Sequence, residues 1–82
     1  MVATIRTKRH EQLIEAIVAE RKKAGIRQVP LAKKLKRSQT WIARIESGER
    51  RIDVIEFLEL AEAIGFDPYA MITLLFRRSA AN

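Results

Sequence analysis

Apolar residues recur every three or four positions along most of the chain, which is the spacing that places them on one face of an α-helix. The pattern predicts five helices, over about residues 8–24, 28–35, 39–47, 54–64 and 68–78. Gly25, Gly48 and Gly65 follow the first, third and fourth segments, and glycine commonly ends a helix. No stretch alternates apolar and polar residues for long, so we expect no strand and predict an all-α fold.

Residues that cap helices stand before four of the five segments. Thr7 and Ser38 can accept hydrogen bonds from backbone N–H groups at the starts of the first and third helices. Asp53 is followed three residues later by Glu56, which is the spacing of a capping box. Asp67 precedes a proline, and proline is favoured at the first position of a helix. These local signals fix where the helices are expected to begin.

The apolar positions of each segment define its expected inner face. In order along the chain they are Leu13, Ile14, Ile17, Val18 and Ala24; Leu31, Ala32 and Leu35; Ile42 and Ile45; Val54, Phe57, Leu58, Ala61 and Ile64; and Met71, Ile72, Leu74, Leu75 and Phe76. Trp41 is expected in or beside the core. Glu56, Glu59 and Glu62 are expected on a solvated helix face, and His10 at the surface without a role.

Length and composition exclude several classes of protein. A chain of 82 residues provides one domain, and with no cysteine it can form neither disulfides nor cysteine-based zinc sites. A single histidine cannot build a histidine metal cluster. Because the sequence shows no nucleophile with a base and no glycine-rich phosphate loop, we expect no enzyme activity, metal or cofactor. No window approaches 18 consecutive apolar residues and no signal peptide is recognised, so we expect no membrane partner and a cytoplasmic location.

Positive charge is concentrated in the middle of the chain. The formal net charge is +6, yet residues 21–51 hold eleven basic residues against two acidic ones. Residues 53–76 hold five acidic residues and no basic one. The first segment therefore suits a polyanionic partner and the second does not.

The second and third predicted helices are joined by residues 36–38 alone, so the two short helices must cross steeply. This arrangement is a helix-turn-helix. Ala32 provides the small side chain needed where the two helices approach each other. The outer face of the third helix then carries Gln39, Thr40 and Arg44.

The sequence here resembles the lambda-repressor-like helix-turn-helix family, also called the Xre or Cro/repressor type. The resemblance is carried by the glutamine that opens the second helix, Leu-Ala at 31–32, Ser38, and Ile-Glu-x-Gly-x-Arg at 45–50, and it extends over about residues 13–72. It implies a five-helix domain whose third helix lies in the major groove of double-stranded DNA, and a homodimer that reads a two-fold related site. It also implies an ion pair between Glu46 and Arg21 of the first helix.

On this interpretation the polar residues around the third helix divide by their chemistry. Gln39, Thr40 and Arg44 are expected to contact bases, since glutamine suits adenine, threonine suits thymine and arginine suits guanine. Contacts to phosphate are expected from Gln28, Arg27, Lys36, Arg37, Ser47, Arg50 and Arg51.

Two positions depart from the family pattern. Lys36 and Arg37 occupy the turn where the family usually has glycine and then an apolar residue, so a lysine must adopt a left-handed conformation at some cost. Arg27 stands where the family usually has a threonine or serine cap for the second helix.

The apolar residues of the last helix exceed what a small core can cover. Met71, Ile72, Leu75 and Phe76 are therefore candidates for a dimer interface, with the first helix as the alternative surface. The predicted organisation is a flexible basic arm at 1–7, a DNA-binding domain at 8–78 containing the helix-turn-helix at 28–47, and a frayed tail at 79–82.

The resulting interpretation is a small bacterial or phage-type transcriptional regulator, a repressor that binds an inverted repeat as a homodimer and associates with the nucleoid when bound to DNA. The main alternative is an antitoxin-like module whose acidic C-terminal half binds a partner protein. A restriction–modification controller is a variant of the first interpretation. An RNA-binding protein lacks support because the chain has only five aromatic residues, most of them needed in the core. A basic membrane-surface helix is weaker still.

Overall fold

The computed structural model describes the backbone of residues 7–81 and the side chains of residues 7–78. Within this part of the chain there are five helices and no strand, as predicted. Their bounds are α1 Lys8–Lys23, α2 Gln28–Leu35, α3 Gln39–Glu46, α4 Val54–Ile64 and α5 Pro68–Ala81. The predicted basic arm at 1–7 lies outside the described residues except for Thr7, and Asn82 of the predicted tail also lies outside them.

The helices begin where the caps predict. Thr7 and Ser38 accept hydrogen bonds from the backbone of His10 and Trp41, at 3.2 and 3.1 Å. Asp53 and Glu56 form the reciprocal bonds of a capping box. Asp67 accepts bonds from the first turn of α5. Arg27 provides no side-chain cap to α2, in agreement with its poor capping chemistry.

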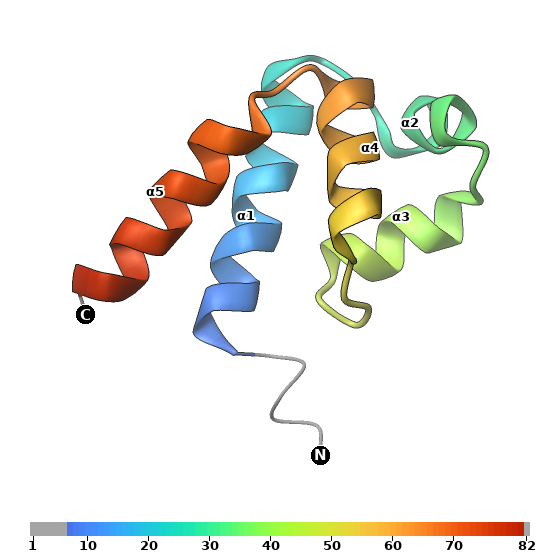
Figure 1. Ribbon diagram of the computed structural model, residues 1–82. Coiled ribbons are helices and arrows are strands. Elements are labelled where there is room, and N and C mark those ends of the chain that lie inside the picture. Colours follow the sequence, from blue (N-terminus) through green and yellow to red (C-terminus); the bar gives the residue numbers. More distant parts are fainter. Residues whose placement is uncertain (1–6, 82) are drawn as a thin grey trace.

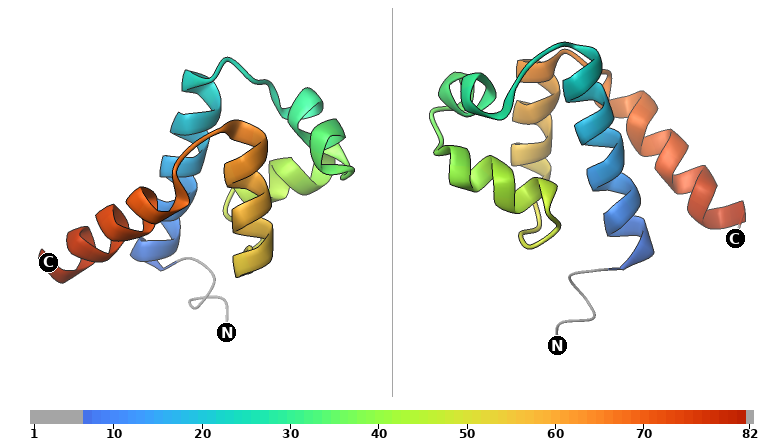
Figure 2. Two further views of the ribbon diagram at one scale, coloured as in Figure 1. Left: turned by 45° about the horizontal axis from the view of Figure 1, so that its top comes forward. Right: turned by 180° about the vertical axis from the view of Figure 1, so that it is seen from behind.

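Helices α1 and α4 stand between two outer parts of the fold. Figure 1 shows α2 and α3 on one side of this pair and α5 on the other, and the view from behind in Figure 2 shows the same order. The core lies where these elements meet. Its most deeply buried large side chains are Ile17, Leu31, Ile42, Ile45 and Leu60.

The inner face of α4 differs from the prediction. Val54 and Leu58 were expected inside but are exposed, whereas Leu60 is among the most buried residues. The reason is that α2 and α5 cover α4 along a face that includes position 60 and excludes positions 54 and 58. An apolar pattern as dense as that of α4 does not by itself select which stripe is covered.

Two polar residues expected at the surface are buried. His10 is 5% exposed and lies at the start of α1. Glu56 is 8% exposed, which corrects its expected place on a solvated face, although Glu59 and Glu62 are exposed as predicted. Local periodicity misplaced Glu56 because its basic partners come from other elements, Arg50 from the loop before α4 and Arg37 from the turn between α2 and α3.

The turn between α2 and α3 has the strained residue that the sequence predicts. Lys36 adopts φ 56° and ψ 42°, and it is the single non-glycine residue with positive φ in the described part of the chain. The N–H of Arg37 then donates to Ala32 O at 2.9 Å, which satisfies a carbonyl at the end of α2.

No helix among the described residues is long and apolar enough to cross a bilayer.

Candidate nucleic-acid interface

Helix α3 presents one face to the core and one to solvent. Ile42 and Ile45 are buried against the rest of the fold. On the opposite side Gln39, Thr40 and Arg44 are exposed, which are the three residues predicted to contact bases. Ser38 holds the first turn of α3 in place, so Gln39 and Thr40 project from a fixed helix end, while Arg44 lies in the last turn.

A chain of hydrogen bonds links this exposed end to α1. Arg21 donates from Nε and Nη2 to the two oxygens of Glu46, at 2.6 and 2.9 Å, and from Nη1 to Ile26 O at 2.8 Å. Glu46 Oε1 also accepts from Gln28 Nε2 at 2.8 Å. Gln28 Oε1 in turn accepts from Gln39 Nε2 at 2.8 Å. The structure thus brings together four residues that the sequence placed in three different roles.

This chain of bonds determines which edge Gln39 shows to solvent. An ionised carboxylate only accepts hydrogen bonds, so Gln28 must turn its amide nitrogen toward Glu46. The oxygen of Gln28 then faces Gln39 and takes one of its N–H groups. The second N–H and the oxygen of Gln39 remain available, and this is the pair that an amide uses on adenine N7 and N6. Gln28, predicted to hold a phosphate, has its side chain engaged by Glu46 and Gln39.

A second cluster surrounds Trp41 on the side of α3 that faces α4. The guanidinium groups of Arg37 and Arg50 lie 4.5 and 5.3 Å from the centre of the indole ring. Arg50 donates two hydrogen bonds to the carboxylate of Glu56, at 3.1 and 3.0 Å. Arg37 Nη2 lies 3.7 Å from the same carboxylate. Two predicted phosphate contacts therefore share one buried acid.

Electrostatics within this cluster favour the charged forms. The hydrogen bond from Arg50 lowers the pKa of Glu56, helped by the N–H of Asp53 and by the charges of Arg50 and Arg37, although burial acts in the opposite direction. The same hydrogen bond raises the pKa of Arg50. The sequence predicted the capping role of Glu56 but not this ion pair, since no local spacing links residues 50 and 56 across a loop.

Further cations and donors lie around α3. Arg27, Lys36 and Arg51, three of the residues predicted to contact phosphate, are exposed. Ser47, also exposed, donates its hydroxyl toward Arg44 O and Glu49 Oε2, at 3.1 and 3.0 Å. The positive residues thus lie before, within and after α3 rather than along one helix.

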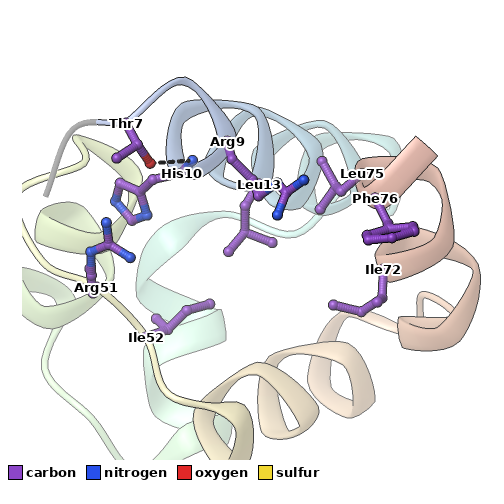
Figure 3. Close-up of a pocket in the computed structure, with 9 residues that line it drawn as sticks. All are labelled: Thr7, Arg9, His10, Leu13, Arg51, Ile52, Ile72, Leu75 and Phe76. Atoms are coloured by element: carbon purple, nitrogen blue, oxygen red, sulfur yellow. Dashed lines mark hydrogen bonds between the residues drawn. The ribbon is translucent and has the colours of Figure 1, made fainter. Parts of the chain in front are cut away.

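The four candidates for a dimer interface separate into two pairs. Met71 and Leu75 are buried in the core, so their side chains are not available to a partner. Ile72 and Phe76 are exposed, at 51 and 65%. Figure 3 shows Ile72 pointing with Leu13 toward a hollow bounded by α1, α5 and the loop before α4.

This hollow continues into a second one between α4 and α5. Exposed apolar residues surround the two, and we call them the α4–α5 apolar face: Val54, Leu58, Tyr69, Ile72 and Phe76. The sequence signalled Ile72 and Phe76, but it assigned Val54 and Leu58 to the core and gave no role to Tyr69.

Comparison with known proteins agrees with this geometry. A family model described as a helix-turn-helix domain matches residues 8–71. A comparison with curated protein sequences finds no match. Among solved structures, the chain is similar to an XRE-family like protein from Pseudomonas syringae pv. tomato str. DC3000, with 40% identity, a TM-score of 0.82 and 85% of each chain covered. The chain belongs to the XRE-like family of helix-turn-helix proteins.

Proposed function

We propose that this protein is a transcriptional repressor that binds a specific inverted repeat in double-stranded DNA as a homodimer. Its membership in the XRE-like helix-turn-helix family supports a DNA-binding regulator. The observation that carries the finer proposal is the oriented amide of Gln39 on the exposed face of α3. A fixed donor–acceptor pair at a helix end suits a base edge better than a phosphate, which offers only acceptors.

The proposed division of labour follows the exposure of each residue. Gln39 reads an adenine, Thr40 contacts an adjacent base, and Arg44, about one turn along α3, reaches a guanine or a phosphate. The cations at both ends of α3 contact the phosphates on either side of the groove. Arg27 and Lys36 are exposed, and no ion pair restrains them in the described part of the chain.

Dimerisation is proposed through the α4–α5 apolar face. Tyr69 and Phe76 are 81 and 65% exposed, and a contiguous apolar patch of this kind commonly marks an interface. Helix α5, which carries three of the five residues of this face, lies on the other side of α1 and α4 from α2 and α3 (Figure 1), so two copies paired through α5 would leave both α3 helices uncovered. Two-fold symmetry then predicts an inverted repeat, with half-sites about 34 Å apart.

Selection from a random duplex DNA library at about 150 mM salt tests the proposal, since binding that depends only on charge is weak there. We expect enrichment of an inverted repeat with half-sites about 10 base pairs apart. Binding that fades with salt and enriches no sequence would contradict specific recognition. Repression is tested by placing the selected site within a promoter and measuring transcription with and without the protein.

Substitution of Gln39 by alanine tests the placement of the recognition residue. We expect Gln39→Ala to weaken binding to the selected site by about 1–3 kcal/mol and to relax the preference at one base pair. Lys36→Ala provides the control, because loss of a phosphate contact should weaken binding to all sequences alike. An unchanged base preference for Gln39→Ala would show that another surface reads the DNA.

A further inference from the structure

Glu56 holds two arginines that flank the recognition helix. Arg37 stands just before α3, and Arg50 lies in the loop that follows it. Arg50 is bound in a bidentate manner, with both distances near 3 Å. Arg37 is bound more loosely, with its nitrogen 3.7 Å from Glu56 Oε2. Both arginine side chains remain more than a third exposed, so they can reach solvent or a ligand without unfolding the protein.

The acid itself is fixed in the fold. Glu56 is buried, and its Oε1 also accepts the backbone N–H of Asp53 as part of the capping box. Its negative charge therefore cannot move away when DNA approaches. Trp41 holds the two guanidinium groups from the other side, with both within 5.3 Å of its ring centre.

We propose that Glu56 restrains DNA binding by competing with phosphate for Arg37 and Arg50. The inference rests on the proposed DNA-binding function and concerns its strength. A guanidinium that already bonds a carboxylate releases fewer counterions from DNA than a free one, so it contributes less to affinity and to its salt dependence. Arg37 is released first, because its contact to Glu56 is the longer one. The protein therefore binds DNA more weakly than its number of exposed cations would suggest.

The substitution Glu56→Gln removes the charge and keeps an amide oxygen for the capping box, in which glutamine is an accepted partner. We expect this variant to bind a random-sequence duplex about three- to tenfold more tightly at 0.1 M salt, with a slope of log K against log salt steeper by roughly 1. The matched control is Glu59→Gln on the same helix, which makes the same change in net charge at an exposed residue without an ion pair among the described residues. Equal effects of the two substitutions would overturn the proposal.

A second measurement isolates Arg37. Arg37→Ala should weaken DNA binding only slightly in the natural background and several-fold more in the Glu56→Gln background, because only there is Arg37 released from the carboxylate. Equal losses in the two backgrounds would contradict competition. Thermal unfolding of each variant identifies any that fail to fold. The effect of Arg37→Ala on DNA binding is also measured in the Glu59→Gln background, and comparison with its effect in the natural background tests for a generic charge effect.

The emission of Trp41, the single tryptophan of the chain, gives an independent signal. We expect DNA to change this emission in the natural protein as Arg37 leaves the indole ring, and the change to be smaller in Arg37→Ala, in which only Arg50 remains over the ring. A DNA-induced change of undiminished size in Arg37→Ala would argue against release of this arginine. Failure of the unaltered protein to bind any duplex would instead overturn the proposed function itself.

Discussion

At the scale of single residues, Glu56 makes stability depend on acidity. Its pKa is held below the ordinary value of 4.5 in the folded protein, chiefly by the hydrogen bond from Arg50. The unfolded chain therefore takes up this proton first as the pH falls. The stabilisation is fully present above the unfolded pKa and is lost as the pH falls through the folded pKa.

We expect the free energy of unfolding to decrease below about pH 5 and to do so less steeply in Glu56→Gln, which has no proton to take up at this position. Urea unfolding at a series of pH values between 7 and 3 measures this. If the free energy of unfolding of the natural protein and of Glu56→Gln changed in parallel with pH, the charge of Glu56 would not contribute to stability.

Residue-level features were predictable where they depend on neighbours in sequence. The caps at Thr7, Ser38 and Asp53 need only a side chain and the backbone two or three positions later. The burial of His10 and Glu56 was not predictable in this way, because burial depends on how the helices and loops pack together. The contact of Gln28 with Gln39 is not predictable from neighbours either, because it depends on how α2 packs against α3.

At the scale of elements, the turn of the helix-turn-helix combines strain with charge at Lys36. The left-handed backbone conformation of Lys36 is strained for a residue with a side chain and is not strained for glycine. Glycine, however, loses more conformational entropy on folding. We expect Lys36→Gly to raise the free energy of unfolding by about 0.5–1 kcal/mol, the balance of these two effects. Urea unfolding with Lys36→Ala as control separates the effects, because alanine removes the same charge without relieving the strain.

The two substitutions at Lys36 should nevertheless weaken DNA binding equally. Both remove one exposed cation beside α3, and both leave the rest of the interface unaltered. A lower stability for Lys36→Gly than for the natural protein would indicate that the left-handed turn is not a source of strain.

Helix boundaries were predictable to within one residue at most ends, since glycine, proline and the caps mark them locally. The rotation of α4 about its own axis was not predictable from the sequence. Its sequence offers apolar residues on more than one stripe, and only the positions of α2 and α5 decide that Leu60 is covered and Val54 is not. Which face of α4 is buried is therefore determined by tertiary packing.

At the scale of the whole molecule, the α4–α5 apolar face predicts self-association. We expect the sedimentation coefficient to rise with protein concentration in a manner that fits a monomer–dimer equilibrium. Ile72→Glu should abolish the rise, because it places a charge at the centre of the face. Leu74→Glu is the matched control on the same helix, with almost the same exposure (53 against 51%) and a position facing α1 instead.

Two outcomes would contradict this assignment. Dimerisation that survives Ile72→Glu would move the interface elsewhere, with α1 as the next surface to test. A protein that stays monomeric at all concentrations would favour a partner protein on the same apolar face, where Glu59 and Glu62 provide exposed acids close by.

The chain of hydrogen bonds that joins Arg21, Glu46, Gln28 and Gln39 also constrains how relatives can diverge. Gln28 can accept the hydrogen bond of Gln39 only while Glu46 fixes the orientation of the Gln28 amide. Positions 28, 39 and 46 should therefore covary among members of the family. Thr40 and Arg44 are exposed and belong to no such set, so they should vary one at a time. New binding preferences would then arise most readily at positions 40 and 44, with the base read by position 39 the slowest to change.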